Sequence, residues 1–271
     1  MNCRTAVTLA VGVALLGACA HRAPNSVSSL LDRVMPTPVL MLGEQHDAPE
    51  HQALQRDVVQ ALAARGQLGA LVMEMAEAGH QTTGLPADAS EARVREVLAW
   101  TDDAATGWPW AIYGPVVMAA VRAGVPVLGG NLPRSQMRAA MGNAALEDRI
   151  SSTALQEQRE GIRSGHCDLL PEGQIAPMAR IQLARDDAMA QTTVQAVQQA
   201  GAGKTVVLVA GNGHVRRDLG VPLYLPKSLA HRVVMAQAGE PSSAAPADAV
   251  WLTPAQPPRD YCAELRQQFK R

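Results

Sequence analysis

The sequence predicts an α/β fold, with a mostly parallel sheet, flanking helices and an inserted helical subdomain. Past residue 38, short apolar runs alternate with longer stretches of helical periodicity, which is the pattern of parallel strands joined by crossover helices. About 75 residues of helical character separate the third and fourth apolar runs, which is more than one crossover requires. With 47% apolar and 18% charged residues among 271, the chain has the balance of a packed globular protein.

Each element is predicted from the length and periodicity of its segment. Four clear apolar runs predict strands at residues 39–42, 71–75, 125–129 and 205–210, and weaker runs predict strands at 232–236 and 249–252. Helical periodicity predicts helices near residues 50–65, 90–100, 115–123, 135–150 and 177–200. Because the chain has one Phe, three Tyr and four Trp, its core must be filled by Ala, Val, Leu and Met.

The charge balance excludes one broad class of partner. Lys and Arg number 24 and Asp and Glu 25, which gives a formal net charge of -1. No overall basic field would draw this chain to nucleic acid or to anionic lipid. We therefore expect no nucleic-acid partner.

The first 18 residues are predicted to be a lipoprotein signal peptide. A short positive start precedes an apolar run over residues 6–18. This run is shorter than the roughly 20 residues of a membrane span but suits a signal peptide. The small residues before Cys19 resemble the bacterial lipobox, which predicts lipid, palmitate included, on Cys19. An ordinary secretory signal or a tethering helix is the alternative.

This interpretation divides the chain into three parts. Residues 1–18 are the signal peptide, residues 19–37 a lipidated tether, and residues 38–271 an α/β domain with a helical insertion around residues 85–200. Ala20 after the cysteine resembles the pattern of lipoproteins sent to the outer membrane of Gram-negative bacteria. We therefore expect a protein of the bacterial cell envelope, attached to the outer membrane through its N-terminal lipid.

Two of the four cysteines remain after processing. Cys3 is removed with the signal peptide and Cys19 is acylated, which leaves Cys167 and Cys262. In an oxidising compartment such a pair can close a disulfide that ties the C-terminal tail to the middle of the chain. The alternative is two unpaired buried thiols.

Polar side chains follow the ends of four predicted strands. They are Glu44 and His46 after the first, Glu74 on the second, Asn131 after the third, and Asn212 and His214 after the fourth. Open parallel sheets bind ligands beyond the carboxyl ends of their strands. The sequence therefore predicts that these groups converge on one crevice.

Both histidines of this crevice belong to a Gly-x-x-His motif. Gly43 precedes His46 and Gly211 precedes His214 by three residues, and glycine allows a sharp turn at a strand exit. Two neutral imidazoles and a carboxylate would leave open positions on a divalent ion. One hypothesis is therefore a metal-dependent hydrolase in which Glu44 or Glu74 is ligand, base or partner to a histidine. The other is that the histidines are structural.

Seven short sequence blocks lie in order along the chain, at residues 43–46, 72–75, 110–115, 131–134, 166–171, 185–190 and 211–214. Their order and spacing resemble the ChaN-like haem-binding branch of the Tiki superfamily. Members of that family carry paired Gly-x-x-His motifs and an acidic residue on an intervening strand. The resemblance implies a haem-binding lipoprotein of haem and iron uptake, a binding protein rather than an enzyme. An outer-membrane haem receptor would be its partner, and a homodimer is left open.

Haem requires an iron ligand, an apolar wall and polar partners for its propionates. Tyr113 and His166 are the predicted ligands, and a tyrosinate suits ferric haem in a carrier that later releases it. Trp110 is predicted to contact the porphyrin, because three of the eight aromatic residues lie within residues 108–113. These three residues would alternatively anchor the insertion onto the sheet. The arginines predicted to receive a propionate, or to pair with a crevice carboxylate, are Arg134, Arg180 and Arg185.

Overall fold

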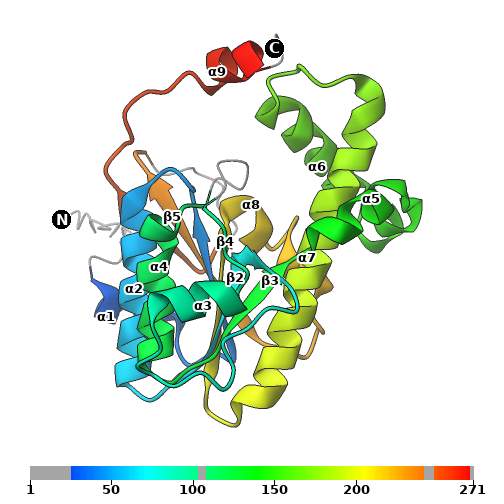
Figure 1. Cartoon of the computed structure of the whole chain (residues 1–271). Helices are drawn as coiled ribbons and strands as arrows, with labels where there is room; N and C mark the ends of the chain where they lie inside the picture. Colours follow the sequence, from blue (N-terminus) through cyan, green and yellow to red (C-terminus); the bar gives the residue numbers. More distant parts are fainter. Residues whose placement is uncertain (1–25, 103–107, 241–246, 269–271) are drawn as a thin grey trace, which may run out of the picture.

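Six parallel strands form one sheet in the computed structural model, which describes residues 26–102, 108–240 and 247–268 (Figure 1). The strands are β1 (Val39–Glu44), β2 (Leu68–Glu77), β3 (Val127–Asn131), β4 (Thr205–Gly211), β5 (His231–Ala238) and β6 (Ala249–Thr253). Their order across the sheet is β3-β2-β4-β1-β5-β6, and every neighbouring pair is parallel. The predicted α/β class and all six predicted strands are confirmed.

Helices cover both faces of the sheet (Figure 1). One apolar layer joins the sheet to α1 (Val27–Val34), α2 (Pro49–Ala64), α3 (Glu91–Val97) and α4 (Trp110–Arg122). A second layer joins the opposite face to the long helix α7 (Glu172–Ala200), to α8 (Asn212–Val215) and to η2 (Val221–Tyr224). In β1, for example, Leu40 and Leu42 enter the first layer and Val39 and Met41 the second. Strands buried on both faces have apolar side chains throughout, which explains the unbroken apolar runs of the sequence.

The helical insertion between β3 and β4 forms an arm beyond the carboxyl ends of the strands (Figure 1). The arm comprises α5 (Arg134–Gly142), η1 (Ala144–Arg149), α6 (Ser152–Gly165) and the first half of α7. Small apolar clusters of its own hold it together, one of them around Ile162, Ile175 and Ala179. Because α7 is one continuous helix of 29 residues, it joins this arm directly to the sheet.

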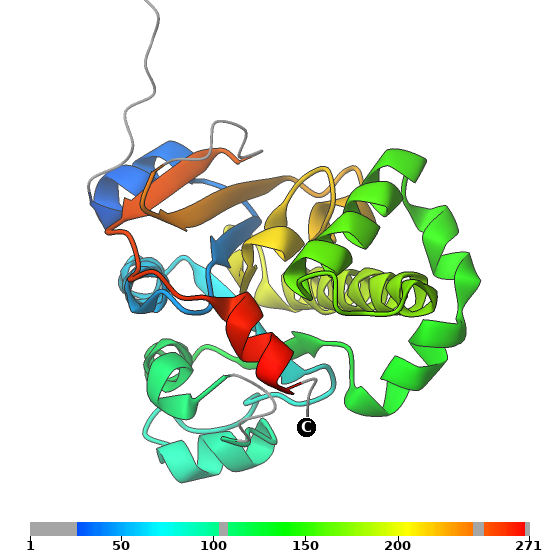
Figure 2. The same ribbon diagram turned by 90° about the horizontal axis from the view of Figure 1, so that it is seen from above.

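The C-terminal strap, residues 254–268, returns from the end of β6 across the carboxyl ends of the strands (Figure 2). It ends in α9 (Tyr261–Gln268), where Cys262 forms a disulfide with Cys167 at the end of α6, with the two Cα atoms 5.6 Å apart. The Tyr261 hydroxyl also donates a hydrogen bond to Asp47. The strap is therefore fastened to the arm by a covalent bond and to the β1–α2 loop by a hydrogen bond.

The predicted tether over residues 19–37 is wrong in its second half. Helix α1 lies within it, begins with a capping box between Ser26 and Ser29, and buries Leu30 and Leu31 completely. Apolar residues at helical spacing give this short segment a face that packs on α2. The predicted signal peptide and Cys19 lie outside the described residues. In the part of the chain that is described, no helix has both the length and the apolar character needed to cross a membrane.

Candidate functional site

The Glu44 carboxylate accepts four hydrogen bonds at the carboxyl end of β1. Its Oε1 accepts from His46 Nδ1 and from the Tyr113 hydroxyl, each at 2.6 Å. Its Oε2 accepts from the side-chain amides of Gln52 and Gln55 on α2, at 2.8 and 2.6 Å. Burial opposes a charge on His46, but the hydrogen bond to Glu44 raises the pKa of this imidazole. Burial and the Glu44 charge raise the pKa of Tyr113, so its phenol stays protonated.

A second histidine cluster lies at the carboxyl ends of β2 and β4. His214 on α8 donates through Nδ1 to Asp186 of α7 at 2.6 Å, and its Nε2 lies 3.4 Å from Glu74 Oε1. The other Glu74 oxygen accepts from the Gly211 backbone N–H at 2.7 Å. Burial opposes both charges, yet the mutual attraction raises the pKa of His214 to about 10 and lowers that of Glu74 to about 2. Burial raises the pKa of Asp186 to about 6 against the pull of His214.

Two glycines allow these clusters to approach each other. A Cβ on Gly211 would lie 3.0 Å from His46 Nε2, and a Cβ on Gly43 would lie 2.4 Å from Asn212 Oδ1. The Asn212 amide in turn donates to the Ala236 carbonyl of β5 at 2.8 Å. Both glycines of the Gly-x-x-His motifs thus serve close packing at the strand ends.

Each imidazole of the crevice binds a carboxylate through Nδ1, Glu44 for His46 and Asp186 for His214, and His214 Nε2 faces Glu74. In a metal site, an imidazole held in this way would offer its Nε2 to the ion. Among residues 26–102, 108–240 and 247–268, no group of three or more His, Cys, Asp or Glu side chains is arranged to hold a metal ion.

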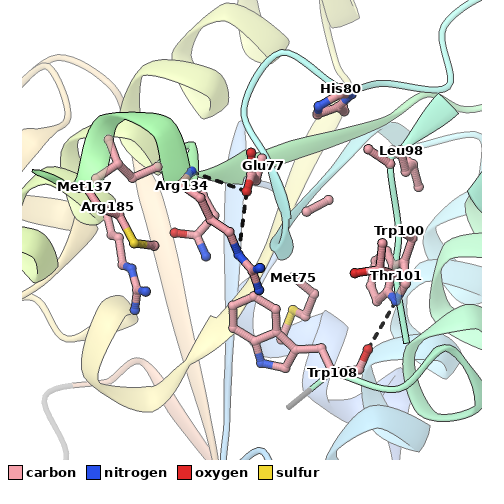
Figure 3. A pocket seen from close by; sticks show the side chains of 14 residues that line it. Met75, Glu77, His80, Leu98, Trp100, Thr101, Trp108, Arg134, Met137 and Arg185 are labelled. Carbon is pink, nitrogen blue, oxygen red and sulfur yellow. Dashed lines mark hydrogen bonds and ion pairs between the residues drawn. The ribbon is translucent and has the colours of Figure 1, made fainter. Parts of the chain in front are cut away.

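A cavity of about 650 Å³ opens beside these clusters, between the arm and the segment that follows α3 (Figure 3). Figure 3 shows Trp100 and Thr101 across the cavity from Met137 and Arg185. Trp108 also lines the cavity, and its ring meets the His46 ring edge-on at a centroid distance of 6.2 Å. The other lining residues are Met75, Ala76, Glu77, His80, Leu98, Ala99, Asn131, Leu132 and Arg134. The cavity therefore combines indole walls with arginine side chains.

The predicted haem contacts lie in different places. Arg134 lines the cavity, where its Nε is 4.0 Å from Glu77. Tyr113 is 1% exposed and points into the Glu44 cluster. Trp110 is buried next to it, with its indole N–H donating to Glu91 at 2.9 Å. His166 caps α6 and, with His214, lines a separate cavity of about 520 Å³.

Sequence reasoning missed three hydrogen-bond partners of the site. Gln52 and Gln55 lie one turn apart on α2 and are buried, although their residue type is typical of a helix surface. Asp186 is completely buried in α7, yet its connection to His214 was not predicted. In each case the usable signal is a polar residue at a core position of a helix.

The family model described as haem-binding uptake, Tiki superfamily, ChaN matches residues 30–225. The chain belongs to this family. Membership of a haem-binding family supports haem as the ligand, and it confirms the resemblance drawn from the sequence blocks. A search of curated proteins gave no match.

A solved structure of ChaN shows the same fold. ChaN of Campylobacter jejuni, described in a study of cofacial heme binding, has a TM-score of 0.64 and 22% sequence identity, covering 83% of this chain and 89% of its own. The type III effector HopBA1 has a TM-score of 0.46 and 14% identity, covering 87% of this chain and 97% of its own.

Proposed function

We propose that this protein is a lipid-anchored haem-binding protein that takes part in haem or iron uptake at the bacterial cell envelope. The observation that carries the proposal is the indole-walled cavity at the carboxyl edge of the sheet, in a chain that belongs to a haem-binding family. An outer-membrane haem receptor is the proposed partner. Haem would lie between the edge of the sheet and the helical arm.

The residues of this cavity fit a porphyrin. Its volume of about 650 Å³ lies within the range of roughly 300–1,000 Å³ typical of ligand pockets. Trp100 and Trp108 offer flat apolar surfaces, and Arg134 offers a cation for a propionate. When bound, haem would supply an iron centre, and these side chains would orient the ring and exclude water from it.

Three side chains are candidates for the iron ligand. His80 lines the cavity and carries an imidazole, the commonest protein ligand of haem iron. To bind iron as a tyrosinate, Tyr113 would have to break its hydrogen bond to Glu44 and lose its proton. Burial and the Glu44 charge oppose this loss, because both raise the pKa of Tyr113. His166 binds the Ile162 carbonyl through Nδ1, which leaves Nε2 to accept a metal, but it lies at the other cavity. We propose His80 as the ligand.

Titration with hemin tests the cavity. We expect the purified protein to develop a saturable Soret band, and Trp108→Leu to weaken binding by about 10-fold or more through lost stacking surface. Trp251→Leu is the matched control, because Trp251 lies on β6 and is not part of the cavity lining. Absence of a saturable spectral change would overturn the proposed function.

The side chain that binds the haem iron is identified with three variants in the same titration. His80→Ala should shift the Soret and visible bands of the hemin complex, while Tyr113→Phe and His166→Ala should leave their positions unchanged. A shift in Tyr113→Phe alone would assign the iron to the phenol, as the sequence predicted. A shift in His166→Ala alone would place haem in the cavity beside His214.

The proposed anchor rests on the lipobox-like sequence before Cys19. Cys19→Ser should move the protein from the membrane fraction to the soluble fraction of the cell envelope, without loss of hemin binding. Retention of the variant in the membrane fraction would contradict lipid attachment at this cysteine. Sedimentation of the purified protein with and without hemin tests for a homodimer.

A further inference from the structure

The C-terminal strap lies across the molecule without being packed into its core. No residue from 254 to 267 is buried, and Tyr261 is 47% exposed. In α9, the exposed side chains of Tyr261, Glu264 and Arg266 point in different directions around the helix axis. A helix that rests on a protein body buries one of its faces. The strap therefore spans the carboxyl edge of the sheet as an arch.

Within the described chain, the strap is fastened to the body on two sides. Two side-chain hydrogen bonds tie it to the segment from the end of β1 into α2, one of them from Tyr261 to Asp47. The disulfide between Cys262 and Cys167 ties it to the arm. A helix of eight residues is marginal on its own, and a hydrogen bond at the surface contributes little net stability. The disulfide is therefore the contact that keeps the strap in this position.

The strap passes above the carboxyl edge at which the large cavity lies. Seen from that edge, α9 lies between the arm and the helices α3 and α4 (Figure 2). The cavity lies between the same two parts, with Met137 of the arm on one side and Trp100 and Trp108 on the other. None of the described residues that line the cavity belongs to the strap. The strap thus covers the approach to the cavity and is not part of its wall.

We propose that the strap is a lid that controls ligand exchange, and that the Cys167–Cys262 disulfide is its latch. While the disulfide is intact, the strap stays between the arm and the α3–α4 side and narrows the path to the cavity. This inference rests on the proposed function, under which the ligand is haem. A lid that does not touch the bound ligand slows entry and release by the same factor, so it leaves the equilibrium affinity unchanged.

Two rate measurements test the lid. Rapid mixing with hemin measures entry, and transfer of bound hemin to excess apomyoglobin measures release. The Cys167→Ser, Cys262→Ser double variant opens the latch without leaving a free thiol to bind iron. We expect both rate constants to rise by about 10-fold in this variant, while the Kd stays within about 2-fold of its original value. Reduction of the folded protein with a dithiol, followed by alkylation of both thiols, should give the same two rate constants.

Leu62→Ala is the matched control for general loosening of the fold. Leu62 is buried in the last turn of α2, at the end of the helix away from the strap, and its loss should leave both rate constants unchanged. Equal acceleration in Leu62→Ala would overturn the lid, and so would unchanged rates in the double variant. Faster release with unchanged entry would make the strap a ligand contact instead. Absence of hemin binding by the unmodified protein would overturn the proposed function itself.

Discussion

Glu44 shows how a single buried carboxylate can organise a site. Four side chains from three segments donate to it, so their orientations are fixed by one charge. A buried carboxylate is tolerated only when its lone pairs are occupied. Removing one donor should therefore cost more than the loss of an ordinary surface hydrogen bond.

Two tyrosines with buried hydroxyls, Tyr113 and Tyr224, permit a matched comparison of this effect. Tyr113→Phe removes a 2.6 Å hydrogen bond to the Glu44 carboxylate and should destabilise the fold by about 1.5–3 kcal/mol. Tyr224→Phe removes a buried hydroxyl that has no partner in the described part of the chain, and should be neutral or stabilising. Urea unfolding of the two variants measures both values. Equal losses would contradict the role given to Glu44.

The His214 cluster makes stability depend on pH. The folded-state pKa of His214 is raised to about 10, so its ion pair with Glu74 stabilises fully below the ordinary histidine pKa of about 6.5 and is lost as pH rises toward 10. Glu74 contributes stability above its ordinary pKa, and this is lost as pH falls toward 2. Near pH 6, His214→Gln should cost about 3–5 kcal/mol. Thermal unfolding should show this cost shrinking between pH 7 and 10, and a constant cost would contradict the ion pairs.

At the level of single residues, the sequence predicted positions better than contacts. The Gly-x-x-His spacing correctly placed His46 and His214 at strand ends, because a strand exit is defined locally. It did not reveal that Asp186, 28 positions before His214, would bind it, since that contact depends on how α7 packs on the sheet. Tyr113 was expected at a haem surface, and whether it reaches iron is decided by the hemin experiments.

Helix α8 and the end of β1 approach each other closely at Gly43. A Cβ on Gly43 would lie 2.4 Å from Asn212 Oδ1 and 2.5 Å from Val215 Cγ2, so Gly43→Ala must displace α8. We expect a loss of about 1–3 kcal/mol, as for other overpacked positions. Gly161→Ala is the control, because Gly161 is exposed within α6 with nothing near a new Cβ, and should stabilise by about 0.5–1 kcal/mol. Calorimetry that ranks these variants in the reverse order would contradict the close approach.

Strands were predicted more reliably than helix starts. Parallel strands buried on both faces leave unbroken apolar runs, which few other structures produce. Helix α4 begins at Trp110 rather than near residue 115, because Pro115 lies inside the helix instead of at its start. Helix α1 was assigned to a linker, since eight residues give too short a periodic pattern to stand out from a polar segment.

The strap and its disulfide belong to the scale of the whole molecule. Reduction of the Cys167–Cys262 bond should lower stability by about 2–4 kcal/mol and expose the strap to protease. The Cys167→Ser, Cys262→Ser double variant should have the same reduced stability with or without reductant. Thermal unfolding measures the loss of stability, and limited proteolysis measures the exposure of the strap. Unchanged cleavage of the reduced protein would show that the strap is held without its disulfide.

Helix α7 is the element that joins the helical arm to the sheet. A continuous helix of 29 residues is a rod of roughly 43 Å, and its outer half is also braced by the strap through Cys167. Arg185 and Asp186 are neighbours on this rod, one facing the cavity and the other holding His214. The wall of the cavity and the His214 cluster are therefore parts of one rigid element, and a tilt of α7 would displace Arg185 and Asp186 together.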